Sequence, residues 1–299
     1  MKILNFGSLN IDLFYHVARF ASAGETIDSL SYQKNIGGKG LNQSVALSRA
    51  GGKVFHAGNV GADGDFLVNY LQSAGVDTHL IGRSEIPSGN AVIQIDPNGQ
   101  NCILLYGGAN RQVTEQQIDR VLSEFVAGDW LILQNEINQM DTIITKAHEK
   151  GMQIVLNPSP FAGCSDLPLD LVDWFIMNEH ESAQLAGQTD QQAILSALVK
   201  RFPNARFVMT LGGDGSVYFD GQVCHRQGTY PVEVVDTTGA GDTFTGFFFA
   251  SVAAGKPVPQ AMELAARAAS IAISRMGAAP SIPPCKKYCK LACRYAAVL

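Results

Sequence analysis

The sequence predicts an α/β fold in which helices cover both faces of a mainly parallel β-sheet. Short runs rich in Val, Ile, Leu and Phe alternate with longer segments of helical periodicity along most of the 299 residues. The hydrophobic fraction of 46% and the charged fraction of 16% describe a globular chain with a large core. Two strand-like runs joined by a tight turn interrupt this alternation and predict a small separate antiparallel sheet.

The opening residues form the first expected strand and place polar groups at its end. The run KILNF is apolar, and Gly7, Ser8 and Asn10 follow it. Because α/β proteins build their binding sites at the carboxyl ends of such strands, these residues are candidates for a site. After the glycines at 37–40 the pattern becomes helical, and the glycines at 51–52 close the helix.

The next strand is expected at 53–61 and the next helix at 65–76. A hairpin follows, in which NAVIQID at 90–96 pairs with NCILLYG at 101–107 through the turn residues DPNG. Because this hairpin is inserted into a strand–helix series, we expect it to form a separate sheet that acts as a lid.

Beyond the hairpin, strand and helix patterns alternate again. Strands are expected at WLILQ (130–134), QIVLNPS (153–159), WFIMN (174–178) and RFVMTLG (206–212), with helical segments between them. Strands of this composition, flanked by helices, are typical of a parallel sheet that is buried on both faces. The sequence shows no internal repeat and no low-complexity linker, so a single main domain is expected.

Charge and cysteine content exclude several classes of partner. A formal net charge of -5 provides no basic field for nucleic acid or for an anionic membrane. The most apolar stretch, 244–254, is interrupted by Thr245 and Ser251 and cannot span a bilayer. Six cysteines show no framework spacing over the first 280 residues, which favours a reducing cytoplasm.

The segment 234–255 contains the pattern that indicates chemistry. We expect it to begin as a strand, turn through Gly239, Ala240 and Gly241, and continue as an apolar helix. Such a turn lets backbone N–H groups converge at a helix N-terminus, where a phosphoryl group that develops negative charge is stabilised. Asp242 places a carboxylate beside this cup. Read alone, Asp242 also fits an ordinary helix-start residue.

Two long motifs give the chain a family resemblance. The run DTTGAGDTF at 236–244 resembles the C-terminal signature of the ribokinase-like (PfkB) family of carbohydrate kinases. The run GGKGLNQSVALSRAGG at 37–52 resembles the N-terminal signature of the same family. Shorter matches occur in the family's order: GSLNID at 7–12, NEHE at 178–181, TLGGDG at 210–215 and RMGAAPS at 275–281.

The resemblance spans roughly residues 1–282 and implies one kinase domain over 1–299. The implied fold is a Rossmann-like parallel-sheet sandwich of the ribokinase-like type, with a small antiparallel β lid. The lid strands would come from roughly 10–35 and 88–108. The hairpin is apolar at alternate positions, such as Val92, Ile103 and Leu105, so we expect a homodimer formed through the lid.

The resemblance also implies roles for individual residues in phosphoryl transfer to a sugar. Asp242 would be the general base, and Gly239, Ala240 and Gly241 would form the anion hole. The implied sugar contacts are Asn10, Asp12, Gly38, Lys39, Asn42 and Glu136 together with Asp242. Acceptors and amides suit a polyol, because each buried hydroxyl must be paired.

The nucleotide site would come from the C-terminal half, with ATP and Mg²⁺ as cofactors. Its implied residues are Asn178, Glu181, Thr210, Gly212, Gly215 and Gly241. Glu181 would hold Mg²⁺ through water, since this ion usually keeps several waters. On local grounds, Asn178 and Glu181 equally fit a helix N-cap followed by acids that the helix dipole favours.

The resemblance further implies a potassium site built mostly from backbone oxygens and one carboxylate. Its residues would be Asp236, Thr238, Ala272, Arg275, Gly277 and Ser281. We expect this cation to influence the shape of the anion hole and to take no direct part in the chemistry.

D-ribose, phosphorylated at O5 with formation of ADP, is the leading substrate, because the form GGKGxNQ and the residues Asn10, Asp12 and Glu136 favour it. Another pentose or a nucleoside is the second reading. A non-catalytic sugar-binding regulator is a third, although it would be free to lose the base and anion hole that this chain retains. A Rossmann oxidoreductase does not fit, because the first strand leads into GSLNID and not GxGxxG.

The C-terminal tail, 283–299, departs from the family pattern. After Pro284 it contains four basic residues and no acid. Cys285, Cys289 and Cys293 recur every four residues, which would align them loosely on one helix face. These cysteines fit either a metal site or an incidental spacing.

Overall fold

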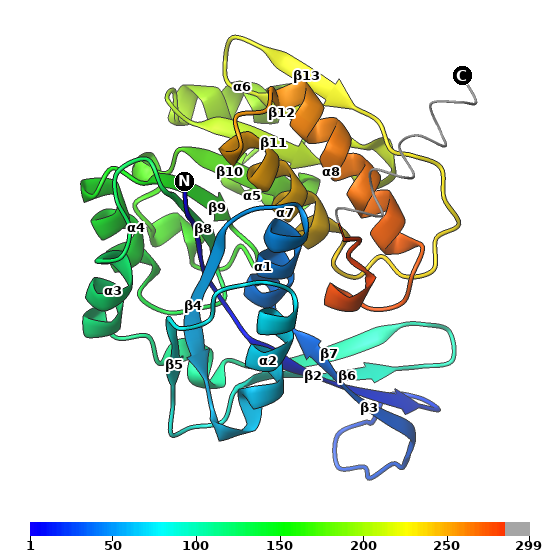
Figure 1. The fold of residues 1–299 in the computed structure, drawn as a ribbon. Helices are drawn as coiled ribbons and strands as arrows, with labels where there is room; N and C mark the ends of the chain where they lie inside the picture. Colours follow the sequence, from blue (N-terminus) through cyan, green and yellow to red (C-terminus); the bar gives the residue numbers. More distant parts are fainter. Residues whose placement is uncertain (285–299) are drawn as a thin grey trace.

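The main sheet of the molecule has nine strands and lies between two layers of helices (Figure 1). The structure is a computed structural model that describes residues 1–284. Seven strands run parallel, in the spatial order β11 (Arg206–Thr210), β10 (Trp174–Asn178), β9 (Gln153–Asn157), β8 (Trp130–Gln134), β1 (Ile3–Phe6), β4 (Val54–Val60) and β5 (Ile81–Arg83). The strands β12 (Ser216–Phe219) and β13 (Cys224–Gln227) extend one edge in antiparallel pairing.

The central strands send alternate side chains into two hydrophobic cores, one on each face of the sheet. In β8, Leu131 and Leu133 join one core, whereas Trp130 and Ile132 join the other. The first core is covered by α3 (Glu115–Leu122), α4 (Met140–Glu149), α5 (Glu179–Ala186) and α6 (Gln191–Arg201). The second is covered by α1 (Lys39–Arg49), α2 (Asp65–Ser73), α7 (Ala240–Ala253) and α8 (Val258–Ile273). The expected α/β sandwich is confirmed.

A second, four-stranded sheet projects from the main body beside β1 and α1 (Figure 1). Its order is β3 (Ser29–Gly37), β2 (Asn10–Val17), β6 (Gly89–Ile95) and β7 (Asn101–Tyr106). The hairpins β2–β3 and β6–β7 are antiparallel, and they join along a parallel β2–β6 pair. Only three residues, 7–9, connect the end of β1 at Phe6 to the start of β2 at Asn10.

The register of the second sheet shows which apolar residues of its hairpin share a face. Ile103 pairs with Ile93, and Leu105 pairs with Ala91, whereas Val92 pairs with Leu104. Since paired residues share a face, Val92 lies opposite Ile103 and Leu105. The apolar residues of the hairpin are therefore divided between the two faces of the sheet.

The prediction of a strand at the start of 234–255 was wrong. Val234 and Val235 are 59% and 50% exposed and lie outside both sheets. The N–H groups of Val235 and Asp236 instead donate to the carbonyl of Ile273 at the end of α8, at 2.8 and 3.1 Å. These bonds hold residues 235–236 beside the end of α8. Pairing with a strand would instead move these residues away from residues 273–281.

Along residues 1–284, no helix combines the length and the apolar character that crossing a membrane requires. The possible metal site at Cys285, Cys289 and Cys293, and nearly all of the tail at 283–299, lie outside the described residues.

Candidate active site

The glycine turn before α7 leaves backbone donors facing an open pocket. Gly239 caps the helix in the left-handed region, with φ at 74°, and a Cβ there would lie 3.0 Å from Ala278. A side chain is therefore strained at this position both by conformation and by contact. The N–H of Ala240 donates to the carbonyl of Thr237 at 3.2 Å. By contrast, within the described chain the N–H groups of Gly241 and Asp242 donate to no protein acceptor.

Asp242 lies in the first turn of α7 and is held by two amide side chains of α1. Its Oδ2 accepts a hydrogen bond from Asn42 Nδ2 at 3.0 Å, and its Oδ1 accepts one from Gln43 Nε2 at 2.9 Å. The side chain is 7% exposed. Asn42 was expected here from the sequence, whereas Gln43 was missed, although it follows Asn42 directly in the same motif.

A glycine in α7 lets the two helices that carry these groups approach closely. A Cβ at Gly246 would lie 2.3 Å from the Cβ of Ala46 in α1, so a side chain does not fit between the helices. The short distance between α1 and α7 brings residues 200 positions apart into hydrogen-bond contact.

Lys39 lies among three carboxylates. Burial alone would lower the pKa of Lys39, but the charges of Asp242, Glu136 and Glu181 outweigh it and hold the pKa above its ordinary value. Glu136 Oε2 accepts hydrogen bonds from the backbone N–H of Lys39, at 3.0 Å, and from the hydroxyl of Ser8. Burial raises the pKa of Glu136, and the bonds from Ser8 and Lys39 offset this only in part. The lysine charge therefore compensates a locally acidic site.

The second sheet contributes Asn10 and Asp12, which lie on one face of β2 because they are two positions apart. Burial, and next the charge of Glu136, raise the pKa of Asp12 to about 7. A Cβ at Gly37 would lie within 2.4 Å of the Asp12 carboxylate, so this neighbour in β3 must be glycine. Asn10 Oδ1 accepts a hydrogen bond of 2.7 Å from Asn110, a buried residue that the sequence did not indicate.

Gly38 lies beside Asn10, at the start of α1. It has a φ of 93°, and a Cβ there would lie 3.0 Å from the backbone nitrogen of Asn10. The chain thus passes close to β2 just before Lys39. The structure brings together the candidate sugar residues from three elements, namely Asn10, Asp12, Gly38, Lys39, Asn42 and Glu136.

A polar pocket opens beside Asp242, among residues expected for the nucleotide site. Residues that line it include Lys39, Asn178, Glu181, Thr210 and the α7 turn at 239–242. Gly212 and Gly215 lie in the turn after β11, outside this lining. Gly215 has a φ of 95°, and a Cβ there would lie 2.0 Å from the carbonyl of Gln227, so the turn requires glycine.

Asn178 and Glu181 form a capping box at the start of α5. Asn178 Oδ1 accepts from the N–H of Glu181 at 2.8 Å, and Glu181 Oε2 accepts from the N–H of Asn178 at 3.0 Å. The local helix-cap reading is therefore correct. Because Glu181 also lines the pocket and contributes to the field around Lys39, capping places its carboxylate at the site.

The six candidate potassium residues gather where the loop before α7 meets the end of α8. Asp236 Oδ1 accepts from the N–H and the hydroxyl of Thr238, and its Oδ2 accepts from Gly277 N at 2.8 Å. Burial opposes ionisation, but these hydrogen bonds keep the pKa of Asp236 below its ordinary value. The remaining contacts join Arg275 to the carbonyls of Ala272, at 3.1 Å, and Ser281, at 3.3 Å.

Comparison with known proteins supports this arrangement. A family model described as pfkB family carbohydrate kinase matches residues 1–285. A ribokinase of Bacillus subtilis is 34% identical over 287 residues, which cover 94% of this chain and 96% of the relative.

Two solved structures also resemble this fold along nearly its whole length. Ribokinase of Cryptococcus neoformans in complex with ADP is 30% identical with a TM-score of 0.86, over 97% of this chain and 99% of that one. Ribokinase of Arabidopsis thaliana complexed with ribose and ATP is 30% identical with a TM-score of 0.86, over 97% and 98%. The buried carboxylate at a glycine-lined helix start, and a family match over almost the entire chain, lead to one assignment: the chain belongs to the pfkB family of carbohydrate kinases.

Proposed function

We propose that the chain is an ATP-dependent ribokinase, which transfers the γ-phosphoryl group of ATP to O5 of D-ribose. The observation that carries this proposal is the Asp242 carboxylate, buried and fixed by two amides beside unpaired backbone donors. Relatives named ribokinase, one of them solved with ribose and ATP, support the choice of both substrates.

In the proposed reaction, the sugar hydroxyl approaches Asp242 from the sugar side and ATP lies in the pocket. Asp242 accepts the hydroxyl proton while the oxygen forms a bond to the γ-phosphorus and the bond to the β-phosphate oxygen breaks, releasing ADP. Of the amides expected to form the anion hole, that of Ala240 is already bonded to Thr237, so the N–H groups of Gly241 and of Asp242, with the charge of Lys39, stabilise the transferred group. Phosphoryl transfer needs mainly positioning and charge stabilisation, and these fixed groups provide both.

The sugar side offers acceptors that a polyol would satisfy. Asn42 Oδ1 is buried and has no hydrogen-bond donor among the described residues, although the Nδ2 of the same side chain is paired with Asp242. An unpaired buried acceptor is costly, so a sugar hydroxyl that donates to it would remove this cost. Asp12 and Glu136 supply further acceptors on the second sheet and after β8.

Asp12→Asn is expected to have opposite effects on stability and on ribose binding. Its pKa of about 7 lies above its unfolded value of 3.8, so the folded protein retains a proton between these values. Wild-type stability therefore falls as the pH rises from about 4 to about 7, whereas Asp12→Asn has no such loss. We expect the gain in stability of the variant over the wild type to be larger at pH 8 than at pH 5. We also expect the variant to bind ribose about tenfold more weakly than the wild type does at pH 8.

Urea unfolding at both pH values and calorimetric titration with ribose measure these effects. The exposed residue Asp28 provides a matched control, and Asp28→Asn is expected to change neither quantity. Unaltered ribose affinity in Asp12→Asn would remove Asp12 from the sugar site.

Mg²⁺ is proposed to bind with the nucleotide. Among the described residues, no group of three or more His, Cys, Asp or Glu side chains could hold a metal ion. This fits an ion held mainly by substrate phosphates, with one carboxylate and waters completing its shell. Glu181, which lines the pocket, would hold it through water, and the ion would neutralise phosphate charge there.

K⁺ is proposed to bind near Asp236. Hydrogen bonds from Thr238 and Gly277 keep the Asp236 carboxylate ionised, and this carboxylate with the Thr238 hydroxyl offers hard oxygen donors that fit an alkali cation. Thr238 lies next to Gly239, so an ion at this place would stiffen the turn that presents the anion hole.

ADP release, measured over a panel of pentoses, hexoses and nucleosides, tests the proposed function. We expect D-ribose to give the highest kcat/KM, to require Mg²⁺, and to react faster in K⁺ than in Na⁺. Preferred turnover of another sugar or a nucleoside would replace the substrate. Ribose binding without turnover of any acceptor would indicate a sugar-binding regulator and overturn the kinase proposal.

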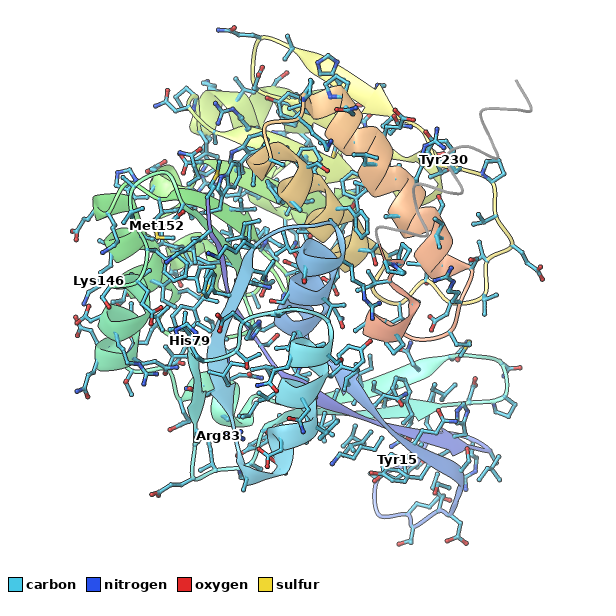
Figure 2. The ribbon with its side chains drawn as sticks, viewed as in Figure 1. Tyr15, His79, Arg83, Lys146, Met152 and Tyr230 are labelled. Carbon is cyan, nitrogen blue, oxygen red and sulfur yellow. The ribbon has the colours of Figure 1, made fainter. Side chains whose placement is uncertain are left out.

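A homodimer formed through the second sheet is proposed as the assembly, in the cytoplasm. Ile103 and Leu105 share the face of Asp12 and are 55% and 52% exposed. At the other side of the sheet, Tyr15, labelled in Figure 2, already packs against Tyr32 with ring centroids 5.1 Å apart. Exposed neighbouring apolar side chains favour a protein contact.

The free state of the cysteines among the described residues agrees with a reducing compartment.

The dimer predicts a native mass of about 64 kDa, twice the 32.0 kDa of one chain. Leu105→Asp is expected to yield the monomer, because a charge would be buried in the contact. Leu104→Asp is the matched control, since Leu104 is 71% exposed on the opposite face of the same strand. Light scattering at micromolar concentration measures both, and a monomeric wild type would contradict the proposal.

A further inference from the structure

A row of buried amide side chains connects a backbone carbonyl of α1 to Asp242. Asn5 Nδ2 donates to the carbonyl of Gly40 at 2.8 Å, and Asn5 Oδ1 accepts from Gln134 Nε2 at 2.9 Å. Gln134 Nε2 also donates to Gln43 Oε1 at 2.7 Å, and Gln43 Nε2 donates to Asp242 Oδ1 at 2.9 Å. Asn5, Gln134 and Gln43 are fully buried.

The direction of every bond in this row follows from its first member. A carbonyl oxygen can only accept, so the carbonyl of Gly40 requires the NH₂ end of Asn5 to face it. The oxygen of Asn5 must then face Gln134, and the NH₂ of Gln134 must face the oxygen of Gln43. Gln43 is left with only its NH₂ group to present to Asp242, which must therefore be the acceptor.

A second backbone carbonyl enforces the same direction from another strand. Asn157 Nδ2 donates to the carbonyl of Ile176 at 2.9 Å, so its oxygen faces Gln43 Nε2 at 3.2 Å. Both hydrogens of the Gln43 amide are thereby assigned, one to Asn157 and one to Asp242. Rotating this amide by 180° would set its oxygen against two acceptors.

The row keeps its direction at a cost. Gln134 Oε1 is buried without a hydrogen-bond partner among the described residues. A Cβ at Gly7 would lie 2.3 Å from that oxygen. A buried acceptor left unpaired is unfavourable, and an apolar side chain would avoid it. Core packing alone therefore does not account for glutamine at this position.

The far end of the row is insulated from titration. Ser44 Oγ accepts from Asn5 Nδ2 at 2.8 Å and lies 2.7 Å from His56 Nδ1. Burial lowers the pKa of His56 to about 3, so the ring is neutral at physiological pH. Asp242 is thus the only member of the connected row whose charge would change during the proposed reaction.

We propose that Gln134 and Gln43 are positioning residues, which orient the Asp242 carboxylate toward the sugar hydroxyl by presenting it with a donor of fixed direction. This inference rests on the proposed kinase function. Neither residue touches a substrate in this reading. Gln134 acts on the base through Gln43, across the sheet from β8 to α1 and then to α7.

Gln134→Glu reverses the polarity of the row while preserving its shape. A carboxylate accepts only, so it would repel the oxygens of both Asn5 and Gln43. The carbonyl of Gly40 prevents Asn5 from turning, and a turned Gln43 would set its oxygen against Asp242. We expect kcat to fall about 100-fold, as for a misplaced catalytic group, with the KM for ATP within about twofold of the wild type.

Two further variants separate positioning from structure. Gln134→Met removes the donor without reversing polarity, and its kcat is expected to fall less than about tenfold. Gln117→Glu is the control, because Gln117 Nε2 also donates to a carbonyl and an amide oxygen, those of Gly58 and Asn59, neither of which belongs to the row. Its kcat is expected to equal that of the wild type. Equal kcat losses in Gln134→Met and Gln134→Glu would overturn the inference.

A readout without turnover keeps this inference distinct from the proposed function. In the wild-type protein, the Gln43 side-chain amide protons are expected to be slow to exchange and to give two separate NMR resonances. Gln134→Glu should shift both of them, whatever the enzyme phosphorylates. Unchanged Gln43 resonances in Gln134→Glu would contradict the positioning role, whereas a wild type that turns over no acceptor would contradict only the function.

Discussion

Asp242→Asn is expected to lower kcat by about 10³-fold or more, within the range that a positioned general base contributes. The loss has two sources. The amide cannot accept the hydroxyl proton, and its NH₂ group would face one of the two donors, Asn42 Nδ2 or Gln43 Nε2, that now hold the carboxylate. Nucleotide affinity should change little, because the backbone donors of the α7 turn remain in place.

Steady-state kinetics and calorimetric titration with ADP measure these two effects separately. Asp141→Asn serves as control, since Asp141 is exposed in the first turn of α4 and belongs to neither helix of the site. Its rate should match the wild type. A rate for Asp242→Asn within tenfold of the wild type would show that another group takes the proton.

Lys39→Met is expected to lower kcat/KM for ATP by about 10²- to 10³-fold, the cost of removing one preorganised electrostatic group from an active site. Without the ammonium, Asp242, Glu136 and Glu181, whose charges now stabilise Lys39, lose the cation that balances them. The incoming triphosphate would add further negative charge to the same space. Methionine keeps the length and the apolar stem of lysine, so packing changes little.

Kinetics over a range of ATP concentrations measures the loss, and thermal unfolding checks that the fold is retained. Lys256→Met, at an exposed lysine after α7, should be indistinguishable from the wild type. If Lys39→Met changed only the KM for ribose, the lysine would belong to the sugar site alone and not to the transferred phosphoryl group.

Much of the site could be predicted from sequence because two motifs carry it. The run 37–52 contains Asn42, the run 236–244 contains Asp242, and the structure joins them at 3.0 Å. Each motif is local, with glycines that specify its backbone and polar residues that specify its chemistry. The pairing of α1 with α7 was not predictable from either motif, since it depends on the small residues Ala46 and Gly246 meeting in the core.

Other parts depend on partners that sequence does not reveal. A buried amide such as Gln134 or Asn110 has the same local signature as any polar residue near a strand end, and only the tertiary arrangement assigns its bonds. Val234 and Val235 have the composition of a strand, yet within residues 1–284 they are exposed and belong to no strand. In the second sheet, the turn at 96–99 predicts the β6–β7 hairpin but says nothing about its parallel junction with β2.

The close contact of Gly246 with Ala46 also bears on how heat would inactivate the protein. Asp242, the proposed base, lies on α7 and its two amide donors lie on α1, and both helices pack into the same core. The distance between base and donors is therefore a property of core packing and not of a surface loop. Catalytic competence and the cooperative melting of this core should be lost at one temperature, without an earlier, separately inactivated native state.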